Sequence, residues 1–142
     1  MLDPTLLDDF TWDNYKDISD ALVKFDGSNI DDEMQRQASL YSYYHGLMIA
    51  AKKMVNDLDA DLTRLSAKLR SGYKMSSTTK LTAKDLDDLV LADDSFVVAQ
   101  KEVNEATFKY ELLKGLVKAL EQKKDMLQQV SANKREEIKL YK

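Results

Sequence analysis

Apolar residues recur at helical spacing along most of the chain, most regularly from Ile30 to about Arg70. One set is spaced by seven residues: Met34, Tyr41, Met48, Val55, Leu62 and Leu69. A second set falls on the complementary heptad position, with Gln37 as its interruption: Tyr44, Ala51, Leu58 and Leu65. Only a partner helix can bury such a seam, so the pattern predicts one long coiled-coil helix, roughly 60 Å in length.

A second long helix is predicted from Phe96 to about Leu140. Its apolar seam is interrupted at Lys124 and comprises Ala99, Val103, Ala106, Tyr110, Leu113, Val117, Leu120 and Leu127. Between the two helices, Gly72 is expected to end the first in the left-handed conformation, and Ser and Thr residues supply a turn. Thr82, with Asp85 three residues later, predicts the cap of a short helix, and "ADDS" at 92–95 predicts a kink. The whole predicts an antiparallel hairpin.

The N-terminal segment has its own short pattern. Trp12, Tyr15, Ile18, Leu22 and Phe25 are spaced by three or four residues, which predicts a short amphipathic helix ended by "DGSN" at 26–29. We therefore expect an acidic N-terminal segment over residues 1–28. The remaining residues, 29–142, would form a helical hairpin domain.

The second long helix carries more apolar surface than one partner helix covers. Beside its seam lie Leu112, Leu116, Ala119, Met126 and Val130. A broad apolar face of this kind favours an oligomer interface. The alternative is a small bundle within one chain, for which residues 1–28 supply the only spare helix.

Composition agrees with an all-α protein and narrows the class. Of 142 residues 44% are hydrophobic and 32% charged, with 4 Gly, 1 Pro and no Cys. The absence of cysteine excludes disulfides and thiolate metal sites, and it suits a reducing cytoplasm. We expect no signal peptide, no membrane span and no cofactor.

Charge is unevenly distributed along the chain. Residues 1–33 hold ten acidic and two basic side chains, a net charge of −8, whereas residues 34–142 hold fifteen acidic and nineteen basic ones, a net +4. A basic body suggests contact with a polyanion. The acidic segment could bind a partner, screen the body or simply be a solvated tail.

Candidate catalytic groups are scarce. The single histidine, His45, lies in "YSYYHG" inside the first long helix, and no phosphate loop or nucleophile motif is present. Acidic pairs such as Asp57/Asp61 and Asp87/Asp88 fit a solvated helix face. Tyr41 and Tyr44 occupy seam positions, which favours core packing over base stacking. We expect no enzymatic activity and no metal site.

The sharpest feature is a basic window, residues 64–84, "RLSAKLRSGYKMSSTTKLTAK". It has six basic side chains and no acidic one. Basic groups that meet phosphates, with an aromatic ring for stacking, are typical of single-strand binding. The candidate nucleic-acid-binding residues are Arg64, Lys68, Arg70, Tyr73, Lys74 and Lys80. The alternative is that bases at a helix C-terminus only complement the helix dipole.

Over residues 29–138 the sequence resembles the UvsY-type phage recombination mediators. The main stretch is "LVLADDSFVVAQKEVNEATFKYELLKGLVKALEQKKDMLQQVSANKREE", which closes on Arg135-Glu136-Glu137. In addition, "LSAKL" at 65–69 is similar to the family's "LKARL"-like motif. Lys68 matches the Arg of that motif, Ser66 replaces its Lys, and Arg70 restores the charge.

This resemblance implies a ring-like homo-oligomer, a hexamer or heptamer, without catalytic activity. Such a protein binds single-stranded DNA and helps to load a RecA-like recombinase onto strands covered by single-strand-binding protein. Two alternatives remain from the residues alone. One is a structural coiled-coil oligomer, a scaffold or assembly chaperone with no nucleic-acid role, and the other is an acidic inhibitor whose residues 1–33 mimic nucleic acid.

Overall fold

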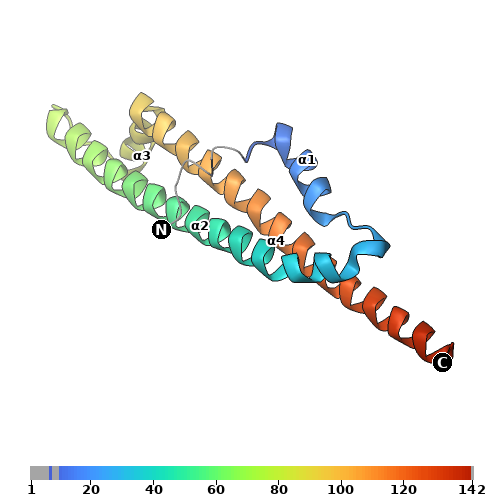
Figure 1. The fold of residues 1–142 in the computed structure, drawn as a ribbon. Helices are drawn as coiled ribbons and strands as arrows, with labels where there is room; N and C mark the ends of the chain where they lie inside the picture. The colour runs from blue at the N-terminus through green and yellow to red at the C-terminus, as the bar shows by residue number, and fades with distance from the viewer. Residues whose placement is uncertain (1–6, 8–9, 142) are drawn as a thin grey trace. The chain divides into compact units, whose positions relative to one another are not determined.

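A computed structural model describes Leu7 and residues 10–141, and every regular element in these residues is helical. The order is α1 (Trp12–Val23), a 3-10 turn (Gly27–Asn29), α2 (Ile30–Ser76), α3 (Ala83–Ala92) and α4 (Asp94–Leu140) (Figure 1). The long helices α2 and α4 have 47 residues each and pair as a hairpin. The predicted all-α class and hairpin are confirmed. No described helix is long and apolar enough to cross a membrane.

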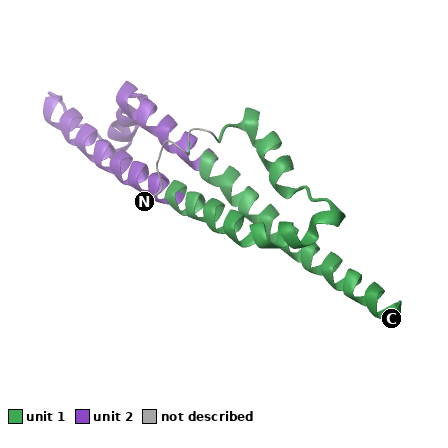
Figure 2. Cartoon of the chain, viewed as in Figure 1, with its two compact units in different colours: residues 1–51, 109–142 green, residues 52–108 purple. Residues whose placement is uncertain are grey.

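The chain divides into two compact units, and both long helices contribute to each. Unit 1 comprises residues 1–51 and 109–142, and unit 2 comprises residues 52–108 (Figure 2). The division runs across α2 and α4, whereas the sequence suggested a boundary after residue 28. The acidic N-terminal segment therefore belongs to unit 1, where α1 is part of the packing.

In unit 1, α1 lies beside α4. Tyr15 of α1 meets α4 at Gly115, where an added Cβ would lie 3.1 Å from the Tyr15 Oη. Farther along, the Leu22 carbonyl accepts a hydrogen bond of 2.6 Å from the Lys123 Nζ. The core residues of this unit are Leu7, Phe10, Ile30, Leu47, Ala51, Leu112, Leu113, Leu116, Val117, Leu120 and Leu127. Three helices thus share one core, because α1 covers a stripe of α4.

The residues of the predicted oligomer interface differ in their burial within the single chain. Leu112 and Leu116 are 8% and 0% exposed within the single chain, and Ala119 is half-buried. Residues of the N-terminal segment lie against α4 nearby, at Gly115 and Lys123, and an interface between subunits stays a prediction. Of the same set, Val130 is half-buried, and Met126 keeps 55% of its surface exposed.

Two polar side chains are buried in the core of unit 1. Lys123 is 2% exposed, and its Nζ lies 2.9 Å from the Glu33 Oε2 as well as donating to the Leu22 carbonyl. Gln37, the interruption of the heptad, is 5% exposed and donates through its Nε2 to the Leu120 carbonyl at 2.6 Å. The residue that interrupts the apolar seam, Gln37, therefore links α2 to α4 by a hydrogen bond. Lys124, the interruption on α4, is exposed.

In unit 2, α3 packs against the end of α2. The predicted cap of α3 is confirmed: the Thr82 Oγ1 accepts from the Asp85 N–H, and the Asp85 Oδ2 accepts from the Thr82 N–H, both at 3.1 Å. The predicted break at 92–95 is also confirmed, since Asp93 lies between α3 and α4. The prediction for Gly72 is wrong. Helix α2 continues through it to Ser76, and no described glycine has a positive φ.

Candidate nucleic-acid interface

The basic window occupies the last turns of α2, the connection to α3 and the first residues of α3. Helix α2 carries Arg64, Lys68, Arg70, Tyr73 and Lys74, and the connection carries Lys80. Lys68, Lys74 and Lys80 are exposed, as is Lys84 at the start of α3. All of these residues belong to unit 2. The structure thus brings the candidate residues into one region, around the junction of two helices.

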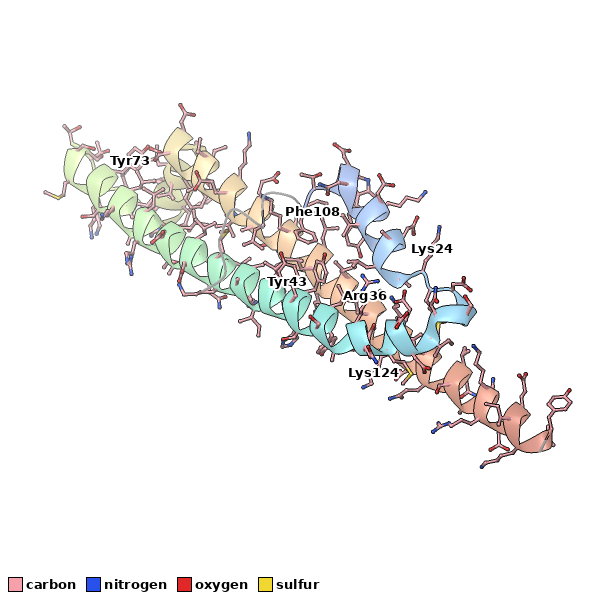
Figure 3. The ribbon with its side chains drawn as sticks, viewed as in Figure 1. Lys24, Arg36, Tyr43, Tyr73, Phe108 and Lys124 are labelled. Carbon is pink, nitrogen blue, oxygen red and sulfur yellow. The ribbon has the colours of Figure 1, made fainter. Side chains whose placement is uncertain are left out.

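The candidates on α2 do not share one face. At about 100° per residue, Arg64 and Lys68 lie on neighbouring positions of one side of the helix. Arg70 and Tyr73 lie on another side, which is the side that meets α3. Figure 3 labels Tyr73 near the end of α2. A single strand that contacted all of them would have to pass around the helix.

Three of the candidates are engaged by carboxylates from outside the window: Arg64 pairs with Asp61 within α2, and Arg70 and Tyr73 meet carboxylates from beyond the turn. The Arg70 Nη1 forms an ion pair and hydrogen bond with the Asp87 Oδ1 of α3. The Tyr73 hydroxyl donates to the Asp93 Oδ2 at 2.5 Å. Although residues 64–84 contain no acidic residue, Asp87 and Asp93 contact this window, because the turn back into α3 brings them against α2.

The Tyr73–Asp93 contact perturbs both groups. The hydrogen bond to Asp93 raises the pKa of Tyr73, since the carboxylate stabilises the neutral phenol. The pKa of Asp93 is lowered, first by the Ser95 side chain and then by Tyr73, because both donate to the ionised carboxylate. Ser95 contributes its hydroxyl at 2.5 Å and its backbone N–H at 2.9 Å. Asp93 is therefore held by Ser95 as well as by Tyr73.

The acidic pairs considered for catalysis are tied to basic neighbours. Asp57 accepts from Lys53 at 2.7 Å, and Asp61 lies 3.3 Å from Arg64. Both are helical pairs at spacings of four and three, which are typical of a solvated helix face. Among the described residues, no three His, Asp or Glu side chains come together as metal ligands.

The aromatic cluster of "YSYYHG" lies in unit 1. Tyr41 is half-buried, donates to the Glu121 Oε1 at 3.0 Å and stacks on His45 at 5.5 Å between ring centroids. Tyr44 packs edge-on against Phe10 at 6.1 Å. Tyr41 and Tyr44 therefore contribute to packing, as their seam positions favoured. Tyr43 remains 42% exposed.

Unit 1 also has a groove between α2 and α4. It encloses about 620 Å³ and is lined by Met34, Gln37, Ala38, Tyr41, Glu121, Lys124, Asp125, Leu127 and Gln128. The buried Gln37 Oε1 has no hydrogen-bond partner. Its apolar lining makes this groove a second surface on which a partner could pack, whereas the Gln37 Oε1 is buried beneath it.

Sequence reasoning missed the acidic residues that meet the window. Asp61 could have been found, since it stands three residues before Arg64 on a predicted helix. Asp87 and Asp93 follow Arg70 and Tyr73 by 17 and 20 residues, and only the register of the turn brings them together. No local pattern carries that information.

Known proteins offer no relative from which a chemistry could be transferred. No family model, no curated protein and no solved structure matches the chain. The resemblance to the UvsY-type mediators therefore rests on the motifs of residues 65–69 and 89–137.

Proposed function

We propose that the chain is a non-enzymatic recombination mediator that binds single-stranded DNA through its basic window. The observation that carries this proposal is the group of exposed lysines at the α2–α3 junction: Lys68, Lys74, Lys80 and Lys84. Each can neutralise a phosphate and release its counterion, which is the main source of affinity for single strands. The threonine hydroxyls at 78 and 79 add donors for phosphate oxygens, whereas those of Ser76 and Ser77 donate to backbone carbonyls.

The wider role follows from the resemblance in residues 29–138. A mediator of this kind would load a RecA-like recombinase onto strands covered by single-strand-binding protein. It would act as a ring-like hexamer or heptamer, because several weak basic sites held together bind a strand more tightly than one. Since Leu112 and Leu116 are buried, self-association would use other apolar surface, such as exposed Met126 and the groove beside Gln37.

A structural coiled-coil oligomer without a nucleic-acid role is the second candidate. It is favoured by the internal partners of Arg64, Arg70 and Tyr73, because side chains occupied by Asp61, Asp87 and Asp93 can serve the fold alone. The two candidates differ in one measurable property, the affinity for single strands.

The test is a fluorescence-anisotropy titration with labelled oligothymidylate at several salt concentrations. We expect binding with little sequence preference. The triple variant Lys68→Ala/Lys74→Ala/Lys80→Ala should bind more weakly, and its salt slope should flatten by about 0.7 for each phosphate that the variant no longer neutralises. These three side chains are exposed, so the fold should be unchanged.

A matched control changes three exposed lysines of α4 in unit 1, Lys114, Lys118 and Lys124, to alanine. This control removes the same charge, and we expect it to keep most of the affinity and slope. If the two triple variants lose affinity equally, the window is no specific site. If the wild type binds no single strand and no variant does, the structural candidate is correct.

A further inference from the structure

The carboxylates of Asp87 and Asp93 accept hydrogen bonds from the Arg70 guanidinium and the Tyr73 hydroxyl, which are groups that could donate to a phosphate instead. Asp87 lies on α3 and Asp93 directly follows it, so one short segment covers both Arg70 and Tyr73. A carboxylate that accepts hydrogen bonds from a guanidinium and a phenol presents the same chemistry as a phosphodiester oxygen. The segment therefore competes with any polyanion for this side of α2.

Helix α3 buries few apolar side chains against the rest of unit 2. Of its ten residues only Leu86 and Val90 are buried. The ion pair is on the surface, with side-chain exposures of 37% for Arg70 and 60% for Asp87, and exposed pairs are weak. The connection from α2 is irregular over 77–82 and is closed by short Ser77–Thr79 contacts. An element held by so few contacts belongs to the low-stability end of a fold and can open locally.

We propose that α3 is a displaceable carboxylate cover over the basic window, and that single-stranded DNA binds fully only when its phosphates replace Asp87 and Asp93. This inference rests on the proposed function, which it deepens. In the covered state Lys68, Lys74 and Lys80 make the first contacts. In the open state Arg70 adds a phosphate contact, and the Tyr73 ring becomes free to stack on a base.

The experiment removes the two carboxylates and keeps the side-chain shapes. The variant Asp87→Asn/Asp93→Asn should bind oligothymidylate roughly three- to tenfold more tightly, the sum of one exposed ion pair and one part-buried hydrogen bond. Its salt slope should steepen by about 0.7, because Arg70 gains a phosphate. The control Asp88→Asn/Asp94→Asn changes the net charge equally from adjacent exposed positions and should have a much smaller effect. Asp87→Glu keeps the charge and should behave as the wild type.

A second measurement follows α3 directly. Amide hydrogen exchange over residues 83–92 should accelerate when oligothymidylate is added, because the cover leaves α2. Circular dichroism checks that each variant is folded. If the asparagine variant matches its Asp88/Asp94 control in affinity and α3 exchange does not change with DNA, the cover is refuted.

The outcomes separate this proposal from the proposed function. A wild type that binds, with variants that all bind alike, overturns the cover and leaves the DNA-binding function standing. Binding by Asp87→Asn/Asp93→Asn but not by the wild type supports both. Absence of binding in every variant overturns both, since no covered site would then exist.

Discussion

At the scale of single residues, the two glycines Gly72 and Gly115 show how position decides the role of a residue. Both lie inside long helices, where glycine is less favourable than alanine by 0.5–1 kcal/mol as a rough guide. No atom lies within 4 Å of a Cβ added at Gly72, whereas at Gly115 the Tyr15 Oη is 3.1 Å away. Gly115 thus permits the close approach of α1, and Gly72 serves no contact.

The substitution Gly72→Ala tests this difference. We expect it to raise the free energy of unfolding by about 0.5–1 kcal/mol, because it removes backbone entropy from the unfolded chain without a clash. Gly115→Ala should gain less, since the Tyr15 hydroxyl must move. Urea denaturation of both variants measures the effect. A loss of stability in Gly72→Ala would mean that this residue has a left-handed backbone after all.

A residue-scale prediction on pH follows from the Tyr73–Asp93 contact. The pKa of Tyr73 is raised in the folded state. Its contribution to the free energy of unfolding is therefore present below the pKa of about 10 in the unfolded chain and is lost as pH rises through the pKa in the folded chain. The pKa of Asp93 is lowered, so its stabilisation is present above about 3.9 and is lost as pH falls through the folded value. The contact is therefore complete between these limits.

The measurement is the ultraviolet absorbance of phenolate, taken as the difference between the wild type and Tyr73→Phe. The difference should show a tyrosine that ionises above the ordinary value of about 10. In an Asp93→Asn background the same difference should shift back toward that value, because the neutral amide does not favour the phenol as the carboxylate does. Equal titrations in the two backgrounds would contradict the contact.

At the scale of elements, α1 decides how much of α4 is open to a partner. Its amphipathic pattern was visible in the sequence, but the surface that it covers was not. Tyr15 at Gly115 and the Leu22 carbonyl at Lys123 align α1 with the stripe that contains Leu116 and Ala119. Helix α1 is thus packed against α4, although none of its own residues is fully buried.

A chain shortened to begin at Gly27 tests the role of α1. Removal of the segment should expose Leu112 and Leu116 and leave the buried Lys123 without one acceptor, at a cost of about 3–6 kcal/mol in the free energy of unfolding. We expect a lower urea midpoint and binding of an apolar dye. Trp12→Ala, which changes a residue that is 67% exposed, is the control and should unfold like the wild type. If the shortened chain has the same urea midpoint as the wild type, residues 1–26 form an independent tail that does not stabilise the fold.

At the scale of the whole molecule, apolar surface remains exposed after each unit has folded. Met126, Ile138 and Leu140 of α4 are at least half exposed, and the groove beside Gln37 adds apolar lining. An apolar surface of this kind is typical of a protein that associates with itself or with a partner. The proposed ring would bury it.

The oligomer prediction follows from this remaining surface. Met126→Lys/Ile138→Lys should reduce the particle mass in light scattering while the helical signal by circular dichroism stays the same. Leu116→Ala should instead lower the stability of the chain by about 2–5 kcal/mol, because it empties a fully buried position. A monomeric wild type at micromolar concentration would refute the ring.

The elements of this protein could be predicted from its sequence because their signals are local. Heptad spacing, the Thr82–Asp85 cap and the break at Asp93 each involve residues within about one or two helical turns. The basic window and its exposed lysines could be located for the same reason. Gly72 was the exception, since a glycine four residues before the end of a helix resembles a cap until the continuing hydrogen bonds are known.

Only the tertiary structure decided which side chains meet across turns. It placed Lys123 in the core and Lys124 outside, buried Leu116 within the single chain, and paired Arg70 and Tyr73 with Asp87 and Asp93. Each outcome depends on the register between helices, which the packing of many side chains fixes together. An apolar stripe is buried equally well by the same chain or by another, so its pattern alone cannot state which one covers it.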